Sequence, residues 1–451
     1  MSDISCKRES TVSDVTGRTG SGRRLLSGPR EPSSELSGGE NPSEAMRETS
    51  LDNGVLILSE KIPSVRSAAI GIWIRQGAAH ETNADAGASH LLEHMVFKGT
   101  RTRSALEIAD TLETLGGSLD AYTSREHTSY QARVLDEHIP VALEVLSDLV
   151  VSPTLRDSDL SLEREVVLEE IAQVEDTPDD LVFEIHSERL WNGHPYGRSI
   201  LGTKLSVEGM KGERLRELHR ERYVGENLVI AAAGNVEHEE FVDRVASHVD
   251  TIVPGVRSEQ VAGPPNTMAG LELIDRGTAQ THIVFGAEAP PHSSEDRYAL
   301  ILVSSVLGGG MSSRLFQKVR EELGLCYSVY TFQSFYRAAG MVGVYVATRP
   351  ATAARASQTV RGELERMAEQ GLSEVDLDRI KQQVKGQVML SLESTGARLH
   401  RLASFAMHDE PFRGLDDVLS GIDAVSCEDA LRVAAQYYDP GCHLELRLGP
   451  G

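Results

Sequence analysis

The sequence predicts an α+β protein with two homologous domains, each a mainly antiparallel sheet packed with helices. Three observations predict this fold class. The 451 residues are too many for one ordinary core and suit two domains. A hydrophobic content of 40% is sufficient to pack both interiors. The order of apolar runs and amphipathic stretches in the first half also recurs in the second half.

Residues 1–47 are rich in Ser, Gly, Pro and Glu and show no periodicity, so we predict a disordered N-terminal extension. The segment has seven acidic and seven basic residues, whereas a mitochondrial transit peptide is poor in acids. Met46 precedes the folded sequence, which suggests the hypothesis that the first 45 residues do not belong to the native product. The intact mass of native protein tests this, because a chain beginning at Met1 would contradict it.

The first domain is predicted to span residues 48–252. Alternating or continuous apolar runs predict its strands, at residues 54–58, 68–74, 118–123, 128–134 and 227–233. Apolar residues at helical spacing predict its helices, at residues 86–97, 105–115, 137–150 and 157–175.

Residues 253–268 contain Pro254, Pro264 and Pro265 without any periodicity, and we place a linker there. The second domain follows as residues 269–451 and repeats the order of the first. Its strands are predicted at residues 271–274, 281–286, 327–335, 340–346 and 444–448, and its helices at residues 295–307, 351–369 and 373–393.

The composition of the chain argues against several classes of protein. A net charge of −23 argues against nucleic acid as the main partner, because phosphate binding needs clustered Lys and Arg. No apolar run reaches the ~18 residues that a membrane span needs. The four cysteines, Cys6, Cys326, Cys427 and Cys442, are irregularly spaced and are expected to be reduced thiols. We therefore expect a cytoplasmic protein.

The strongest chemical signal is the stretch His-Leu-Leu-Glu-His at residues 90–94. On a helix, His90 and His94 share a face, so their imidazoles can bind one ion, and the two leucines between them lie on the core-facing stripe. Two imidazoles suit zinc, which needs a third protein ligand and a water. Zinc lowers the pKa of that water to about 7, and Glu93 is placed to take its proton as general base.

The motif alone leaves an alternative open, because it arises by chance in roughly one sequence of this composition in 25. That alternative is a pair of exposed histidines on a surface helix. An acidic third ligand on a second helix would decide between the two interpretations.

The candidate third ligand is Glu170. Glu163 and Glu170 lie two turns apart on one helix face, which also carries Val166, Val167 and Val174. A carboxylate on such an apolar stripe needs a partner, because an unpaired buried charge is costly. The alternative for Glu170 is an ordinary surface charge, which is also how we interpret the neighbouring residues at positions 165 and 169.

Four further stretches, spread over most of the chain, also carry recognisable motifs, at residues 120–127, 194–197, 308–316 and 320–327. Glu170 also follows His94 by 76 positions. Together with the His-x-x-Glu-His motif, these features resemble the pitrilysin-like zinc peptidases of family M16, the inverzincins. The chain is most similar to the branch that holds the mitochondrial processing peptidase β-subunit and its bacterial homologues. The resemblance covers about residues 49–451, and we therefore expect a bacterial protein.

This resemblance implies a role for each residue of the motif. His90, His94 and Glu170 would be the ligands of one zinc ion per chain, and Glu93 would be the general base. Glu163 would orient one of the ligands from behind, as carboxylates often do at metal sites.

The resemblance also assigns Arg320 and Tyr327, in the second domain, to a pair that completes the active site. The pair would bind the substrate and stabilise the tetrahedral oxyanion. Without the resemblance, we would interpret Arg320 as a helix-surface cation and Tyr327 as a strand aromatic.

The family implies that the peptide substrate adds as an extended strand to a sheet edge in the zinc domain. The matching residues are Asp120, Ala121, Tyr122 and Thr123. Many relatives carry Asn in place of Asp120, and the extra carboxylate here would favour basic substrate residues.

Such peptidases enclose the substrate in a clam-shell chamber of four domains, of which this chain would form one half. Residues 296–303 repeat the motif helix without its histidines, so the second domain is expected to lack a metal site. We therefore expect a homodimer, or a heterodimer with a related chain, in which Arg320 and Tyr327 serve the partner's zinc.

The leading hypothesis is a zinc-dependent metalloendopeptidase that cleaves unfolded peptides or presequence-like segments. One alternative is a non-catalytic subunit of a core-protein-like assembly. Another is a peptidase that needs a metal-free partner chain, as in processing peptidases. Non-catalytic relatives usually lack part of the metal set, whereas all four motif residues are present here.

Overall fold

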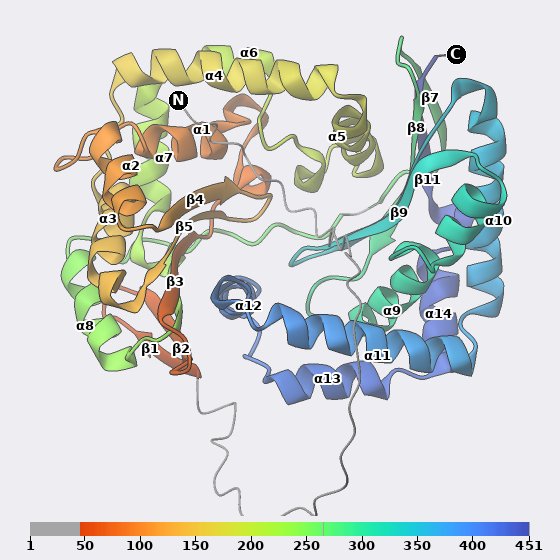
Figure 1. Cartoon of the computed structure of the whole chain (residues 1–451). Helices are drawn as coiled ribbons and strands as arrows, with labels where there is room; N and C mark the ends of the chain where they lie inside the picture. The colour runs from red at the N-terminus through yellow and green to blue at the C-terminus, as the bar shows by residue number, and fades with distance from the viewer. Residues whose placement is uncertain (1–45, 265, 451) are drawn as a thin grey trace, which may run out of the picture.

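Two β-sheets organise the computed structural model, which describes residues 46–264 and 266–450 (Figure 1). The strands of the first sheet are β1 (Met46–Ser50), β2 (Leu56–Lys61), β3 (Ser67–Ile74), β4 (Ser118–Thr123), β5 (Thr128–Leu135) and β6 (Leu228–Gly234). The strands of the second sheet are β7 (Gly270–Asp275), β8 (Thr281–Ala289), β9 (Cys326–Phe335), β10 (Gly340–Thr348) and β11 (Leu444–Gly449).

Both sheets follow the same topology. The first has the order β1-β2-β6-β3-β5-β4, and the second has the order β7-β11-β8-β10-β9. β2 pairs in parallel with β6, and β7 pairs in parallel with β11, while the other pairs are antiparallel. Apart from β1, the two orders match strand for strand. The predicted α+β fold of two homologous, mainly antiparallel domains is therefore confirmed.

Strand β1 opens the described chain and pairs with β2, with Met46 opposite Glu60 and Arg47 opposite Ser59. The sequence assigned residues 46 and 47 to the N-terminal extension, because this segment has no apolar alternation. Backbone pairing with β2 makes both residues part of the sheet, so the sheet includes two residues that the sequence assigned to the extension. The prediction of disorder for residues 1–45 lies outside the described residues.

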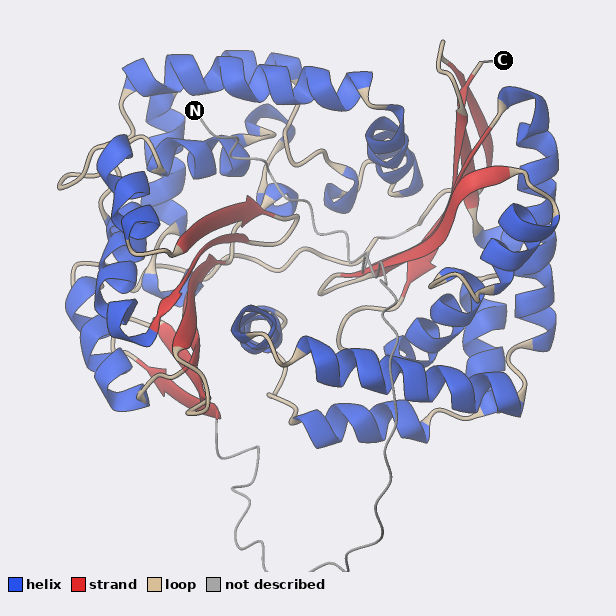
Figure 2. Ribbon diagram, viewed as in Figure 1, coloured by secondary structure: helices blue, strands red, loops and turns tan. Residues whose placement is uncertain are grey.

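Helices of the first domain cover one face of its sheet (Figure 2). The helices of this domain are α1 (Ala88–Val96), α2 (Ala105–Thr114), α3 (Ile139–Val151), α4 (Asp157–Asp176), α5 (Pro178–Leu190), α6 (Lys204–Gly209), α7 (Gly212–Arg222) and α8 (His238–His248), of which α5 lies against the second sheet instead. α3 packs on β3 and β5, α8 packs on β2, and α1 packs on β4 and β5. The apolar core between them includes Ile70, Ile72, Leu91 and Leu143.

The second domain repeats this arrangement with its own helices. They are α9 (Asp296–Gly308), α10 (Ala353–Gln370), α11 (Glu374–Ser391), α12 (Thr395–Met407), α13 (Leu415–Ala424) and α14 (Cys427–Tyr437). The sequence predicted α9, α10 and α11, but it did not predict α12 to α14 here or α5 to α8 in the first domain. Those seven helices are 6 to 13 residues long, and apolar periodicity is a weak signal over so few residues.

Two of these helices cross between the domains. α5 of the first half packs on β8 and β11 of the second sheet, where Val182 meets Val284 and Leu446 in a shared apolar cluster. α12 of the second half packs on β2, β3 and β6 of the first sheet, where Leu402 joins Trp73. Figure 1 shows α12 end-on beside the first sheet. Each sheet therefore has one face covered by its own domain and the other by a helix from the opposite half.

The segment predicted as a linker is attached to the first domain by backbone hydrogen bonds. It forms neither helix nor strand at residues 253–264 and 266–268. The backbone N–H of Ser258 donates to the side chain of Asn227 (2.7 Å), and that of Met268 donates to the carbonyl oxygen of Leu190 (2.9 Å). Throughout residues 46–264 and 266–450, we find no helix that is both long and apolar enough to cross a membrane.

Candidate metal centre

Helix α1 begins at a turn that Gly87 and Glu81 fix. Gly87 has a φ of 89°, and a Cβ on it would lie 2.6 Å from the carbonyl oxygen of Leu201, so a larger residue does not fit. The buried carboxylate of Glu81 accepts hydrogen bonds from the backbone N–H groups of Gly87 (2.8 Å) and Ser89 (2.6 Å). This carboxylate satisfies the free N–H groups of the first turn, which carries His90.

The motif side chains are more buried than the sequence suggested. His90 is 1% exposed and Glu93 is 7% exposed. The sequence placed both on the face of α1 that does not meet the core, but this face packs against α4 and β4. The alternative of two exposed histidines on a surface helix is therefore wrong.

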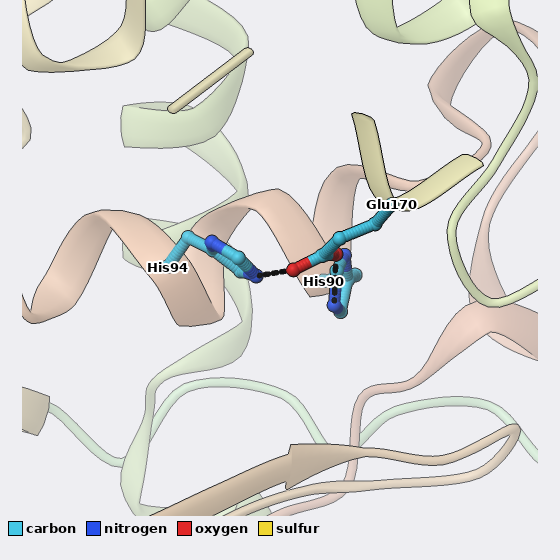
Figure 3. A group of neighbouring side chains, drawn as sticks. All are labelled: His90, His94 and Glu170. Atoms are coloured by element: carbon cyan, nitrogen blue, oxygen red, sulfur yellow. Dashed lines mark ion pairs between the residues drawn. The ribbon is translucent and has the colours of Figure 1, made fainter. Parts of the chain in front are cut away.

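Three donor groups meet between α1 and α4, as Figure 3 shows. Nε2 of His90 lies 3.6 Å from Oε2 of Glu170, and Nε2 of His94 lies 3.6 Å from Oε1 of the same carboxylate. One ligand atom from each residue lies within 4.8 Å of the other two. These separations are too long for hydrogen bonds. They suit ligands about 2.0–2.2 Å from one tetrahedral metal ion, because such ligands lie about 3.4 Å apart.

Several polar atoms of these three side chains lack a hydrogen-bond partner. Both ring nitrogens of His90 and Oε2 of Glu170 are buried and lack a hydrogen-bond partner among the described residues. Buried polar atoms without partners are rare, because each costs free energy. A divalent cation would supply the missing partner, and the set of two imidazoles and one carboxylate is typical of zinc. The residues present therefore fit a metal ion.

Burial and nearby charges shift the pKa values of His90 and His94 in opposite directions. Burial, with the nearby charge of His94, lowers the pKa of His90 to about 3, so this ring is neutral and keeps a lone pair for a metal. Burial acts in the same direction on His94. However, the carboxylates of Glu163, Glu170 and Glu93 outweigh it, and the net shift of the His94 pKa is upward.

Glu163 lies behind His94, on the side away from Glu170. Its Oε2 is 3.2 Å from Nδ1 of His94, and its Oε1 is 2.7 Å from Nζ of Lys98. Burial raises the pKa of Glu163, but the hydrogen bonds from His94 and Lys98 outweigh this and lower it overall. An ionised carboxylate there assigns the ring proton to Nδ1, which leaves the Nε2 lone pair facing Glu170. The sequence did not identify Lys98, because its role depends on a residue 65 positions away.

The buried face of α4 includes fewer residues than the sequence predicted. Val167 is buried beside the site, as expected, but Val166 is 43% exposed. It lies on the flank of α4 beyond the contact with α1, because three residues advance a helix by less than a full turn. The residues at positions 165 and 169 are exposed, as predicted.

Glu93 faces the end of strand β4. Oγ1 of Thr123 donates a hydrogen bond to Oε2 of Glu93, at 2.5 Å. Burial raises the pKa of Glu93 to about 7, although this hydrogen bond acts in the opposite direction. A carboxylate with a pKa near neutrality can both take and return a proton at neutral pH. Sequence reasoning placed Thr123 only among substrate-binding residues and missed this contact, because nothing in the local pattern signals it.

Strand β4 is an edge of the first sheet and pairs only with β5 within the described chain. Its side chains alternate, and Asp120 is exposed while Thr123 is buried. The Tyr122 hydroxyl lies 3.2 Å from Nε2 of His127, and its ring stacks near that of His400 on α12. The structure thus places residues 120–123 in the edge strand of the sheet, and Thr123 of this strand contacts Glu93.

Arg320 and Tyr327 lie in the other domain from α1 and α4, on the π-helix Phe316–Glu322 and at the start of β9. The Arg320 guanidinium lies over the rings of Phe316 (4.5 Å) and Tyr327 (4.8 Å). Tyr327 is 77% exposed. The structure pairs these two residues with each other, and it does not bring them to the histidines of α1.

The rest of the stretch at residues 120–127 joins the domains. The Glu126 carboxylate accepts from the Tyr196 hydroxyl (2.6 Å) and from the backbone N–H of Arg337 (3.0 Å), at the turn between β9 and β10. The Tyr196 ring stacks on that of Tyr336 at 4.6 Å. We call Glu126, Tyr196, Tyr336 and Arg337 the domain clasp. The stretches that match the family contain Glu126 and Tyr196 but not Tyr336 or Arg337, and sequence reasoning missed the role of all four.

The metal-binding cluster has no counterpart in the second domain. His90, His94 and Glu170 form the one group of three or more such side chains found in the described ranges, 46–264 and 266–450. Helix α9, which takes the place of α1 beside the second sheet, contributes none of them. The thiols of Cys326, Cys427 and Cys442 are free, and Cys6 lies outside the described residues.

Comparison with known families places two matches along the chain. The family "Insulinase (Peptidase family M16)" matches residues 56–204, and the family "Peptidase M16 inactive domain" matches residues 210–384. The first match contains the three residues of the metal-binding cluster together with Glu93 and Glu163. The second covers most of the second sheet and helices α9 and α10.

Several bacterial proteins are similar over almost their whole length. An uncharacterized zinc protease of Streptomyces coelicolor is 38% identical over 93% of this chain and 92% of its own. An uncharacterized zinc protease of Bacillus subtilis is 38% identical over 87% of this chain and 96% of its own.

Solved structures share the fold at lower identity. A protease from Helicobacter pylori superposes with a TM-score of 0.84 at 20% identity, covering 90% of this chain and 99% of its own. A peptidase M16 inactive domain from Pseudomonas fluorescens gives a TM-score of 0.85 at 20% identity, covering 90% and 98%.

Proposed function

The chain belongs to peptidase family M16, and on that premise we propose that it is a zinc-dependent metalloendopeptidase that cleaves unfolded peptides or presequence-like segments. One observation carries the proposal. The buried donors of His90, His94 and Glu170 converge at metal-ligand spacing, and Glu93 lies beside them from the same helix. A peptidase is the function that these four side chains serve best, because each has a role in hydrolysis.

His90, His94 and Glu170 would hold one zinc ion per chain. When bound, the ion would supply a Lewis acid that acidifies a water molecule and polarises the scissile carbonyl group. Glu93 would act as the general base, able to hold a proton and to release it to the leaving amine, which its pKa of about 7 supports. Glu163 holds the ring of His94 in one orientation through Nδ1.

The peptide would lie along β4 as an added strand. Residues Asp120, Ala121, Tyr122 and Thr123 belong to the edge strand of the first sheet, and extended peptides pair with such strands through main-chain hydrogen bonds. The exposed carboxylate of Asp120 would favour basic side chains on the peptide. An unfolded segment fits this mode, because a folded protein does not present a free strand.

The active form would be a dimer, either of this chain or with a related chain. Arg320 and Tyr327 lie in the opposite domain from the metal-binding cluster and stack on one another, with Tyr327 exposed. Across a chamber between two chains, they would serve the substrate bound at the partner's zinc. Size-exclusion chromatography at micromolar concentration tests this, and an active monomer would contradict it.

A peptidase that depends on a metal-free partner chain is the closest alternative, and a purified chain that cleaves peptides on its own would exclude it. A purely non-catalytic subunit is not favoured, since the ligands and the base are all present. The bacterial relatives agree with a bacterial source. A cytoplasmic location stays a prediction.

The decisive experiment compares the wild-type chain with Glu93→Gln, which keeps the size of the side chain and removes the base. Each protein is purified alone, its zinc content is measured, and cleavage of an unstructured peptide is followed. We expect zinc in both proteins and a rate reduced by roughly 10²–10⁴-fold in the variant. Absence of zinc from the wild type, or undiminished cleavage by Glu93→Gln, would end the proposal.

A further inference from the structure

Thr123 is the last residue of β4, and its side chain meets Glu93 of α1. It is buried, and its hydroxyl donates to Oε2 of Glu93 at 2.5 Å. The main chain of the same strand carries the edge at which we place the peptide. One residue therefore contacts the general base through its side chain and belongs to the peptide-binding edge through its backbone.

The Thr123 side chain also contacts a second hydroxyl group, that of Thr128. Its Oγ1 lies 3.3 Å from Oγ1 of Thr128, and the Thr128 hydroxyl donates to the carbonyl oxygen of Gln76 at 2.9 Å. Both Thr128 and Gln76 are buried. Two strands, β4 and β5, and the end of β3 thus fix the hydroxyl that meets Glu93.

We propose that Thr123 is a positioning residue that fixes the Glu93 carboxylate to the strand on which the peptide lies. The inference rests on the proposed function. It assigns a second task to a residue otherwise expected only to pair with the substrate backbone. A carboxylate held from β4 keeps its distance to a peptide on the same strand, and small displacements of a reacting group are costly to the rate.

The test uses three variants of the full chain. Thr123→Val keeps the shape and removes the hydroxyl, Thr123→Ser keeps the hydroxyl, and Thr49→Val is the control. Thr49 lies on β1 at the opposite edge of the same sheet, and its hydroxyl is 2.8 Å from a ring nitrogen of His238. We measure kcat and KM for one unstructured peptide, together with the zinc content of each protein.

A positioning role predicts a split between the two constants. In Thr123→Val, kcat should fall by roughly 10–100-fold while KM and zinc content stay close to those of the wild type. Thr123→Ser should restore most of kcat, and Thr49→Val should leave both constants unchanged. A rise in KM with unchanged kcat would instead make Thr123 a substrate-binding residue and overturn the inference.

A second measurement does not depend on activity. In urea denaturation of the metal-free proteins, Thr123→Val and Glu93→Ala should have non-additive effects on the free energy of unfolding, because each substitution removes the hydrogen bond between the two side chains. Additive effects would overturn the inference. An active wild type with unchanged kcat in Thr123→Val would overturn it and leave the proposed function standing. An inactive wild type would overturn the proposed function and the inference together.

Discussion

Glu163 lies 3.2 Å from Nδ1 of His94, on the side of the ring opposite to the nitrogen that faces Glu170. The two residues come from different helices, α4 and α1, that pack against each other. A metal ligand held in this way keeps its tautomer and its direction before any ion arrives, so less ordering is left for the binding step.

Replacing Glu163 should therefore weaken zinc binding without abolishing it. We expect Glu163→Ala to raise the zinc dissociation constant by roughly 10–100-fold, because the ring of His94 loses its fixed orientation. Competition with a chelator of known affinity measures the change. Glu165→Ala, on the exposed side of the same helix, is the matched control and should bind zinc like the wild type. Equal affinities for both variants would contradict this role.

Mixing two inactive variants tests whether the active site is shared between chains. Glu93→Gln lacks the base, and Arg320→Ala lacks the residue that we assign to the partner's site. After subunit exchange of the two homodimers, about half of the dimers would be mixed, and each would contain one intact site. Peptide cleavage should recover to about a quarter of the wild-type rate. No recovery, despite exchange shown by native mass spectrometry, would mean that Arg320 acts within its own chain or not at all.

Removing one hydroxyl should loosen the domain clasp. The Tyr196 hydroxyl donates to Glu126 and accepts from the backbone N–H of Ala338 (3.2 Å), so Tyr196→Phe removes both contacts and leaves a buried carboxylate short of a donor. We expect the free energy of unfolding in urea to fall by about 2–3 kcal/mol. A change below about 0.5 kcal/mol, within the range of ordinary surface substitutions, would show that the clasp contributes little.

Acid should destabilise the chain partly through His408, at the end of α12. Its ring stacks on that of His292 at 3.8 Å, and burial, together with the charge of His292, lowers the pKa of His408 to about 4. Between pH 6.5 and 4, the unfolded chain binds a proton that the folded chain does not, so stability falls as the pH falls through this window.

The contribution of His408 to that loss should be about 2 kcal/mol between pH 6.5 and 5. Urea denaturation at both values measures it, and His408→Gln should lose that much less than the wild type on acidification. His248→Gln, on α8 of the first domain, is the control and should keep the wild-type loss. An acid-induced loss in His408→Gln equal to that of the wild type would contradict the assignment.

Sequence patterns were sufficient for features that depend on neighbours along the chain. A spacing of four on a helix brings His90 and His94 to one side whatever the rest of the protein does. The repeated order of strands and helices likewise predicted two homologous sheets, because a strand pattern and its turn are local. The likeness of residues 90–94 and the other stretches to family M16 predicted the family that the comparisons then found.

Contacts between distant segments needed the folded chain. Several glutamates crowd α4, and packing on α1 selects Glu170 and Glu163 from among them while it leaves the others in solvent. The contact of Thr123 with Glu93, the domain clasp and the crossing of α5 and α12 each join residues with no fixed spacing. A sequence period fixes which side of an element a residue takes, but only packing decides what that side meets. The metal motif could therefore be predicted from the sequence alone, whereas its burial, its supporting residues and the edge strand beside it are properties of the fold.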